Sequence, residues 1–303
     1  MKLPAEQQAL VTATYSRRVD LQLATGEIVA GRIKGKKLRP VCGDLVQVQE
    51  IPNEPELLIT GIQPRDNELS RPNAKGQAEA LAANLSFLAV VAADPPAPDW
   101  FIVDRYLSAA EIMNIAAAVI FNKTDLDTDD DKVQAALGEY AAIGYPIVQC
   151  SAKTGTGIAA VQELLVDHTA IIVGQSGVGK SSIINRLIEN ANQRIAAVSS
   201  GSGEGRHTTV SSLMLQLPGG GAVIDSPGVR DYAPAARSTS EVVAGFREIA
   251  LLGVNCRFAN CMHLREPGCA VKAALTDEKI SARRYESYKR LQALTRKLTQ
   301  GRH

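Results

Sequence analysis

The stretch GQSGVGKSS, residues 174–182, constrains the fold of this 303-residue chain more than any other part of its sequence. It lies between an apolar run, TAIIV, and a helical run, SSIINRLIEN, and it fits the pattern G-x-x-x-x-G-K-S. In a strand–loop–helix of this kind the glycines let backbone N–H groups point at phosphates, and the helix N-terminus adds a favourable dipole. Lys180 is expected to neutralise the β- and γ-phosphates, and Ser181 to bind Mg²⁺. The residues expected to contact the nucleotide are Gly174, Gln175, Ser176, Gly177, Val178, Gly179, Lys180, Ser181 and Ser182.

An aspartate follows this phosphate loop at the distance expected for a second magnesium contact. The run AVIDSPG, residues 222–228, puts Asp225 at the end of an apolar strand and a Pro-Gly turn after it. An Asp-x-x-Gly alone is commonly just a turn. After a phosphate loop it predicts Asp225 as a magnesium residue and Gly228 as a contact near the γ-phosphate.

The stretch FNKTDL, residues 121–126, ends another apolar strand and predicts which base the nucleotide carries. The carboxylate of Asp125 can accept two hydrogen bonds, from guanine N1–H and the exocyclic amine, and adenine offers no such pair. Asn122 is expected to hold the base edge and the Lys123 stem to cover its face, with Thr124 in the same loop. Asn-Lys-x-Asp by itself also fits a strand-to-helix loop with a helix cap.

A further strand end, after YPIVQC, carries Ser151, Ala152 and Lys153. A backbone N–H of this loop is expected to meet the guanine carbonyl oxygen. Four motifs that all end strands predict a GTP-binding GTPase, releasing GDP and phosphate. An ATPase is a poorer alternative, because Asp125 would reject adenine.

Composition supports a folded protein rather than a disordered or membrane-spanning one. Apolar residues make up 45% of the chain and charged residues 21%, and the formal net charge is +1. Attraction to nucleic acid must therefore come from local patches. No apolar run approaches the length of a membrane span, and the first twenty residues lack the apolar core of a signal peptide. Three of the five cysteines lie within 256–269, which argues against a disulfide framework and for a reducing cytoplasm.

The pattern of apolar runs predicts a multidomain protein with three parts. Residues 1–66 contain five short strands, as in an all-β barrel of the oligonucleotide-binding (OB) type. Residues 67–235 alternate strands with helices, which indicates an α/β domain with a parallel sheet. Residues 236–303 are mainly helical around a cysteine-rich loop. The polar segment 64–77 is expected to be a linker.

The order of the motifs differs from that of ordinary guanine-nucleotide switches, in which the phosphate loop comes first. Here the base-binding motifs precede the phosphate loop, and Asp225 comes last. A parallel sheet forms the same pocket whichever strand begins the chain. The order resembles the circularly permuted GTPases, and the flanking domains and cysteine pattern are similar to the ribosome small subunit-dependent GTPase family of bacteria. That resemblance implies a cytoplasmic, monomeric GTPase that binds rRNA and acts in late maturation of the small (30S) ribosomal subunit, which stimulates it.

The loop CRFANCMHLREPGC places four potential metal ligands at the spacing C-x4-C-x-H-x5-C. Three thiolates and an imidazole fill a tetrahedral zinc shell and leave no position for water, so such a site is structural. The alternative is free cysteines in a core. The family's zinc site has the same spacing. The predicted ligands are Cys256, Cys261, His263 and Cys269.

Two basic segments are candidates for RNA contact. The stretch RIKGKKLR, residues 32–39, falls where a barrel loop is expected, and residues 280–297 form a basic helix. The alternatives are a solvated turn and an ordinary docked amphipathic helix. The candidate residues are Arg32, Lys34, Lys36, Lys37, Arg39, Arg283, Arg284, Lys289 and Arg290.

The residue that would orient the hydrolytic water is not obvious, because Val229 follows the Asp-x-x-Gly where many GTPases have glutamine. The candidate is His207, in GEGRHTT, which matches a histidine in the family's corresponding loop. Thr208 or Thr209 is expected to bind Mg²⁺. A lone loop histidine is otherwise simply solvated. The predicted catalytic residues are therefore His207, Lys180 and Asp225.

Two other functions remain compatible with these motifs. One is a permuted GTPase acting on the large subunit or on a non-ribosomal RNA partner. The other is a GTP-gated RNA-binding module with negligible turnover.

Overall fold

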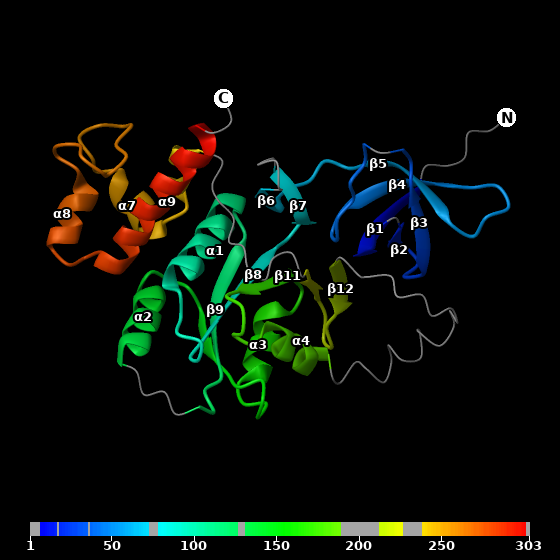
Figure 1. Ribbon diagram of the computed structural model, residues 1–303, viewed down its shortest axis with the longest axis horizontal. Coiled ribbons are helices and arrows are strands. Elements are labelled where there is room, and N and C mark those ends of the chain that lie inside the picture. Colours follow the sequence, from blue (N-terminus) through cyan, green and yellow to red (C-terminus); the bar gives the residue numbers. More distant parts are fainter. Residues whose placement is uncertain are drawn as a thin grey trace.

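The computed structural model describes residues 7–16, 18–35, 37–72, 78–126, 131–188, 212–226 and 238–300. Figure 1 shows three regions in a row: an N-terminal barrel in blue, a central sheet with helices in cyan to yellow, and C-terminal helices in orange and red. This architecture confirms the predicted fold class.

The N-terminal region is a closed five-stranded barrel. Its strands are β1 (Gln7–Thr14), β2 (Arg18–Leu23), β3 (Ile28–Ile33), β4 (Leu45–Glu50) and β5 (Leu57–Ile62). They pair in the order β1-β2-β3-β5-β4, and β4 returns to β1. Alternating side chains point inward, as expected of strands with one buried face. The barrel core includes Val11, Leu21, Val46, Val48 and Ile59.

A hairpin follows the barrel where the sequence predicted a linker. β6 (Glu68–Pro72) pairs antiparallel with β7 (Ala78–Ala83), so the linker prediction for 64–77 is wrong over β6. The segment looked like a linker because its residues are mostly polar. Those polar side chains are paired instead: Arg65 bonds Asp44 at 2.7 Å and Glu68 at 2.6 Å.

The central sheet is parallel over five strands. They are β8 (Phe87–Ala93), β9 (Ala116–Asn122), β10 (Ile147–Gln149), β11 (Thr169–Gly174) and β13 (Ala222–Asp225), in the order β10-β9-β8-β11-β13. All seven residues of β8 are buried, which is typical of a strand covered on both faces. The carboxyl ends of these strands therefore meet at one edge.

Within the described ranges, four helices cover the two faces of this sheet. α1 (Trp100–Met113) and α2 (Asp131–Ala142) contribute to a core that contains the even-numbered residues of β8. α3 (Ile158–Leu165) and α4 (Lys180–Ile188) contribute to a second core that contains its odd-numbered residues. The two cores lie on opposite faces because successive side chains of a strand alternate.

One strand joins the barrel to the central sheet. β12 (Ser212–Gln216) pairs antiparallel with β13, and its other edge pairs with β1. The barrel and the central strands thus form one continuous eleven-stranded sheet. The sequence did not indicate this connection.

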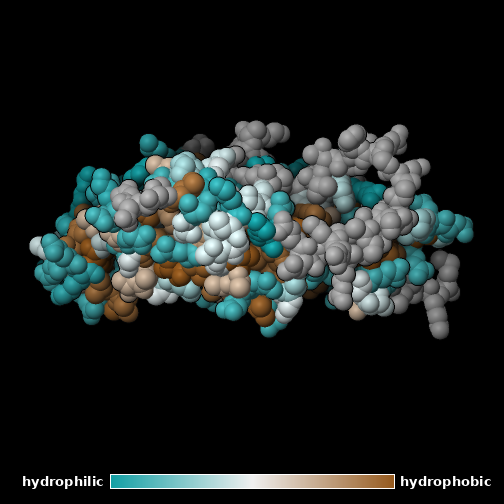
Figure 2. Space-filling model, turned by 90° about the horizontal axis from the view of Figure 1, so that it is seen from below, coloured by the Kyte–Doolittle hydropathy of each residue, from teal (hydrophilic) through white to brown (hydrophobic). Residues whose placement is uncertain are grey.

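The C-terminal region is helical, with α6 (Thr239–Ala244), α7 (Arg247–Gly253), α8 (Ala270–Thr276) and α9 (Ala282–Gln300). Its own core includes Val242, Phe246, Ile249, Tyr288 and Leu291. Seen from below, the end of the molecule that carries these helices shows hydrophilic side chains intermixed with hydrophobic ones (Figure 2). Among the described residues, no helix is both long enough and apolar enough to span a membrane.

Candidate functional site

The phosphate loop (174–182) leaves the end of β11 and enters α4, as its sequence predicted. Gly179 has φ +94°, and a Cβ there would collide with the Asn122 side chain, so only glycine fits between the two loops. Lys180 is buried at the start of α4, and its Nζ donates to the carbonyl oxygens of Gly174 and Gln175, each at 2.7 Å. The ammonium group is thereby held inside the curve of the loop.

The NKTD loop (122–125) follows β9 and lies against the phosphate loop. Asn122 is 2% exposed; its Nδ2 donates to Val178 O at 2.9 Å, and its Oδ1 accepts from Ala152 N at 3.0 Å. One side chain therefore joins the NKTD loop, the phosphate loop and the SAK loop (151–153). The Asn122 amide thus contacts residues that lie 28 to 56 positions after it in the sequence.

Asp125 is held by the SAK loop. Ser151 Oγ donates to Asp125 Oδ1 at 2.6 Å, and Lys153 Nζ lies 3.5 Å from Oδ2. The hydrogen bond from Ser151, with help from Lys153, lowers the pKa of Asp125 below its ordinary value. The side chain is an ionised acceptor, as guanine recognition requires.

The three loops surround one pocket of about 600 Å³. That volume falls within the usual range for small-molecule sites, roughly 300–1,000 Å³. The lining combines an anionic hydrogen-bond acceptor, backbone amides and the side chains of lysine and arginine. This combination suits a base joined to phosphates. The residues that line the pocket are Asn122, Lys123, Asp125, Leu126, Ala152, Lys153, Gly179, Ser182, Asn185 and Arg186.

The segment 94–99 supports two of these loops, and the sequence reasoning missed it. Lys123 Nζ donates to Pro95 O at 2.7 Å, and the Asp99 N–H donates to Gln175 Oε1 at 3.1 Å. Asp99 also caps α1 by accepting from the N–H groups of Phe101 and Ile102. An aspartate before a helical run was a recognisable capping signal, but nothing in the sequence indicated that the segment reaches the pocket.

Asp225 ends β13, the parallel neighbour of β11. It therefore lies at the same sheet edge as the phosphate loop, as the sequence predicted for a magnesium residue. The other predicted residues of this region, His207, Thr208, Thr209 and Gly228, lie outside the described residues.

The four predicted metal ligands converge in the cysteine loop (256–269). Their donor atoms all lie within 4.8 Å of one another. His263 Nδ1 is 3.4 Å from Cys256 Sγ and 3.5 Å from Cys269 Sγ, and the two sulfurs are 3.9 Å apart. Burial lowers the pKa of His263, which favours the neutral imidazole that a metal needs. The cluster, completed by Cys261, could hold a metal ion.

Three side chains outside the ligand set fix this loop, and sequence reasoning assigned them no role there. Glu266 accepts from the backbone N–H groups of Met262, Leu264 and Arg265 at 2.9–3.0 Å. Although burial alone would raise it, these backbone bonds lower the pKa of Glu266 to about 2. From α9, Tyr285 and Tyr288 donate their hydroxyls to the carbonyls of residues 263 and 262.

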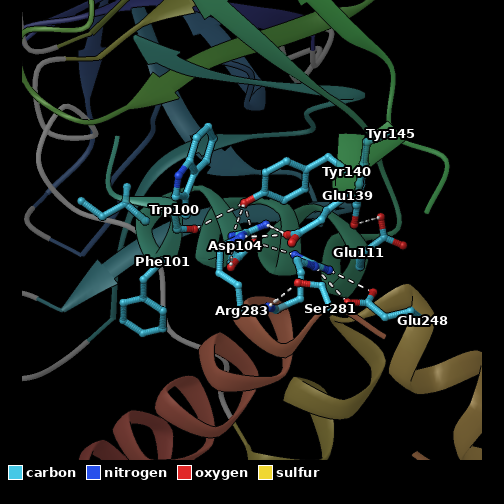
Figure 3. Close-up of polar contacts among 12 residues, drawn as sticks. Trp100, Phe101, Asp104, Glu111, Glu139, Tyr140, Tyr145, Glu248, Ser281 and Arg283 are labelled. Carbon is cyan, nitrogen blue, oxygen red and sulfur yellow. Dashed lines mark hydrogen bonds and ion pairs between the residues drawn. The ribbon is translucent and has the colours of Figure 1, made fainter. Parts of the chain in front are cut away.

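The expectation that the basic residues at the start of α9 face RNA is wrong for Arg283 and Arg284. Arg284 is 1% exposed; it bonds Asp104 at 2.7 Å and Glu248 at 2.9 Å. Arg283 bonds Asp104 and also Glu139 of α2. Together these residues form a charge cluster (Asp104, Glu139, Glu248, Arg283 and Arg284). Figure 3 shows Asp104, Glu139, Glu248 and Arg283 between α9 and the central domain. These arginines dock the C-terminal helices.

The other basic candidates are placed differently. Lys289 is half-buried and pairs with Glu286, and Arg290 lies over the Phe101 ring with its Cζ 4.0 Å from the ring centroid. In the barrel, Arg32 pairs with two glutamates of the connection between β4 and β5, Glu54 and Glu56. Lys34, Lys37 and Arg39 lie in the loop between β3 and β4, and Lys36 falls outside the described residues.

The chain is similar to known proteins along most of its length. A model of the RsgA GTPase family matches residues 62–234. Small ribosomal subunit biogenesis GTPase RsgA of Ectopseudomonas mendocina is 39% identical over 298 residues, covering 96% of this chain and 86% of that protein. The same-named protein of Haemophilus influenzae strain 86-028NP is 38% identical, covering 95% and 85%.

Two solved structures share the fold. The crystal structure of YjeQ from Thermotoga maritima has a TM-score of 0.74 and 29% identity, covering 96% of this chain and 98% of that one. YloQ, described as a circularly permuted GTPase, also has a TM-score of 0.74, with 25% identity and 96% of both chains covered. The permuted order of the loops, their convergence on Asn122 and these likenesses lead to one conclusion: the chain belongs to the RsgA GTPase family.

Proposed function

We propose that this protein hydrolyses GTP in the pocket between the phosphate, NKTD and SAK loops, in the service of small-ribosomal-subunit maturation. The observation that carries the proposal is the meeting of the phosphate and base loops at Asn122, whose Nδ2 lies 2.9 Å from Val178 O. The proposed role in ribosome maturation rests on the relatives, which are named for biogenesis of the small ribosomal subunit.

Within this pocket each loop takes one part of the nucleotide. Asp125 accepts from the guanine N1–H and amine, and the Lys123 stem covers the base. Lys180 exchanges its two loop carbonyls for the β- and γ-phosphates. Ser181 and Asp225 would hold the Mg²⁺ that accompanies GTP. The proposed GTP-binding set is the predicted one: 122–125, 151–153, 174–182 and Gly228.

Water activation is assigned to the segment between the phosphate loop and β12. We keep His207 as the proposed group that orients the hydrolytic water, with Thr208 or Thr209 completing the magnesium shell. If His207→Ala binds GTP normally and hydrolyses it at the parent rate, this assignment is wrong.

The metal of the cysteine loop is proposed to be zinc. A tetrahedral zinc site puts two sulfur ligands about 3.8 Å apart, and sulfur and nitrogen about 3.6 Å apart. The observed separations, 3.9 Å between sulfurs and 3.4–3.5 Å between sulfur and nitrogen, fit those values. Cys256, Cys261, His263 and Cys269 would close the shell. The metal would therefore stabilise the loop rather than catalyse.

RNA contact is proposed for two surfaces, one on each side of the central domain. On the barrel it is the β3–β4 loop with Lys34, Lys37 and Arg39. On the C-terminal region it is a groove of about 480 Å³ between the cysteine loop and α9. The groove contains three basic side chains, Arg265, Lys289 and Arg296. We also propose that the protein is cytoplasmic and monomeric. Its three domains would span residues 1–66, 67–235 and 236–303.

The proposed function is tested by GTP turnover with small subunits, large subunits or neither, across a salt series. Alone, the enzyme should turn over slowly, on the order of 10⁻³ to 10⁻² per second. Small subunits should accelerate it, and the acceleration should fade as salt weakens phosphate contacts. Equal stimulation by both subunits would remove the small-subunit assignment, and no stimulation at low salt would remove the ribosome.

A further inference from the structure

Arg186 lies on α4 and connects the phosphate-loop helix to the SAK loop. Its Nε donates to Ala152 O at 2.8 Å, and its Nη2 donates to Lys153 O at 2.7 Å. The side chain is half-buried and lines the same pocket as Asp125. Hydrogen bonds from a charged donor are stronger than neutral ones. The helix that begins under the phosphates is thus fastened to the base side of the pocket.

These two bonds set the orientation of the SAK loop's peptide groups. In a planar trans peptide the C=O and N–H point in opposite directions. Fixing the Ala152 carbonyl on Arg186 therefore fixes the direction of the Lys153 N–H. The next peptide is held at both ends, because the Lys153 carbonyl bonds Arg186 and the Thr154 N–H donates to Ser151 Oγ at 3.1 Å.

The other attachments of the SAK loop run to the NKTD loop. The Ala152 N–H donates to Asn122, and the Ser151 hydroxyl donates to Asp125. Those bonds hold the amide and side-chain positions, whereas Arg186 holds the carbonyl side. A guanidinium holds its donors in a rigid planar fork, whereas the donors of a lysine ammonium rotate on a flexible stem.

We propose that Arg186 is a positioning residue for base recognition, which holds the SAK loop so that its backbone amides meet the guanine 6-oxygen. The inference rests on the proposed function, because it requires guanine in this pocket. It divides base recognition between two supports. Asp125 serves N1–H and the exocyclic amine, and Arg186 serves the 6-oxygen through the loop.

The test compares binding of GTP, 6-thio-GTP and ITP to the parent protein, Arg186→Ala and Arg186→Lys. Sulfur at position 6 replaces the atom that the loop contacts and leaves the exocyclic amine in place, whereas ITP keeps the 6-oxygen and lacks the amine. Arg186→Ala should weaken GTP binding about tenfold and should reduce the preference for GTP over 6-thio-GTP. Its preference for GTP over ITP should stay at the parent value. Arg186→Lys should give affinities and preferences between those of the parent protein and Arg186→Ala. It provides the test if the alanine variant does not fold.

A matched control is Arg71→Ala, which removes an arginine on β6 that pairs with Glu79 outside the pocket. It should leave all three affinities unchanged. Equal weakening of the three nucleotides by Arg186→Ala would overturn the inference, because a merely structural role would affect them alike; unchanged GTP affinity would also overturn it. A parent protein that does not prefer GTP over ITP and ATP would instead remove the proposed function, and the inference with it.

Discussion

The nucleotide pocket and the docking surface of the C-terminal helices are both held by polar side chains, but the bonding partners differ. In the pocket, Asn122 and Arg186 bond to the backbone of neighbouring loops. At the docking surface, Arg284 bonds to the side chains of Asp104 and Glu248, and both Arg284 and Asp104 are almost completely buried. The first arrangement shapes loops around a ligand. The second fixes one arrangement of two domains.

This difference predicts where each kind of damage will appear. Removing one partner of a buried ion pair strongly destabilises the fold, because the other charge stays buried without compensation. Asp104 and Glu248 raise the pKa of Arg284, against the opposing effect of burial, so the guanidinium stays charged. Substitutions there should change the free energy of unfolding. Substitutions in the pocket should change nucleotide binding and leave the fold intact.

The largest expected effect is that of metal removal. Structural zinc supplies roughly 10–16 kcal/mol of apparent binding free energy in zinc-finger peptides, and that free energy is folding free energy. Chelation, or Cys256→Ser with Cys261→Ser, should abolish hydrogen-exchange protection over 238–300 while GTP still binds. The measurement is exchange together with nucleotide affinity. A parallel loss of GTP binding would show that the two regions do not separate.

Next comes the charge cluster. Arg284→Ala should lower the free energy of unfolding by about 3–5 kcal/mol, because Asp104 and Glu248 lose a buried partner. Chemical denaturation measures it. The control is Arg296→Ala, an exposed position on the same helix, where a change within about 0.5 kcal/mol is expected. Similar losses for both variants would mean that the cluster does not hold α9 in place.

A smaller effect is expected at Asp125. Asp125→Asn puts a donor against the guanine amine and should weaken GTP on the order of a hundredfold, while xanthosine triphosphate gains. The free energy of unfolding should stay near the parent value. Competition binding with the two nucleotides measures the switch. GTP affinity equal to that of the parent would contradict the assignment of the NKTD loop.

The smallest effect should come from Lys153. Its side chain is 78% exposed and lies 3.5 Å from Asp125, and exposed ion pairs contribute about 0–1 kcal/mol. Lys153→Ala should therefore weaken GTP by less than about fivefold, with less effect at high salt. Titrations at two ionic strengths provide the measurement. A loss as large as that of Asp125→Asn would mean that the Lys153 side chain contacts the nucleotide directly.

The fold and the placement of the pocket could be predicted because the motifs end strands. In a parallel sheet the carboxyl ends of strands meet at one edge, so the NKTD and phosphate loops had to converge whatever their order. Asn122 and Val178, 56 residues apart, do meet there. The cysteine loop was predictable because its ligands are close in sequence, and their donor atoms do lie together.

The docking surface could not be predicted because its partners are distant in sequence. Arg284 lies 36 residues from Glu248 and 180 from Asp104, and no local pattern distinguishes it from the exposed basic residues of α9. A related reason applies to β6. The polar composition of its segment did not show that Arg65 pairs with Asp44, which lies 21 residues away. Local composition shows that a charge is present. It does not show whether the partner is water.

The continuity of the sheet has a mechanical consequence. Leu213 of β12 pairs with Ala13 of the barrel on one side and with Asp225 on the other. A ladder of backbone hydrogen bonds is stiff along its rungs, and no loop lies between these three residues to absorb strain. A displacement of β1 in the barrel is therefore transmitted to Asp225, the carboxylate proposed for magnesium, through only two strand pairings.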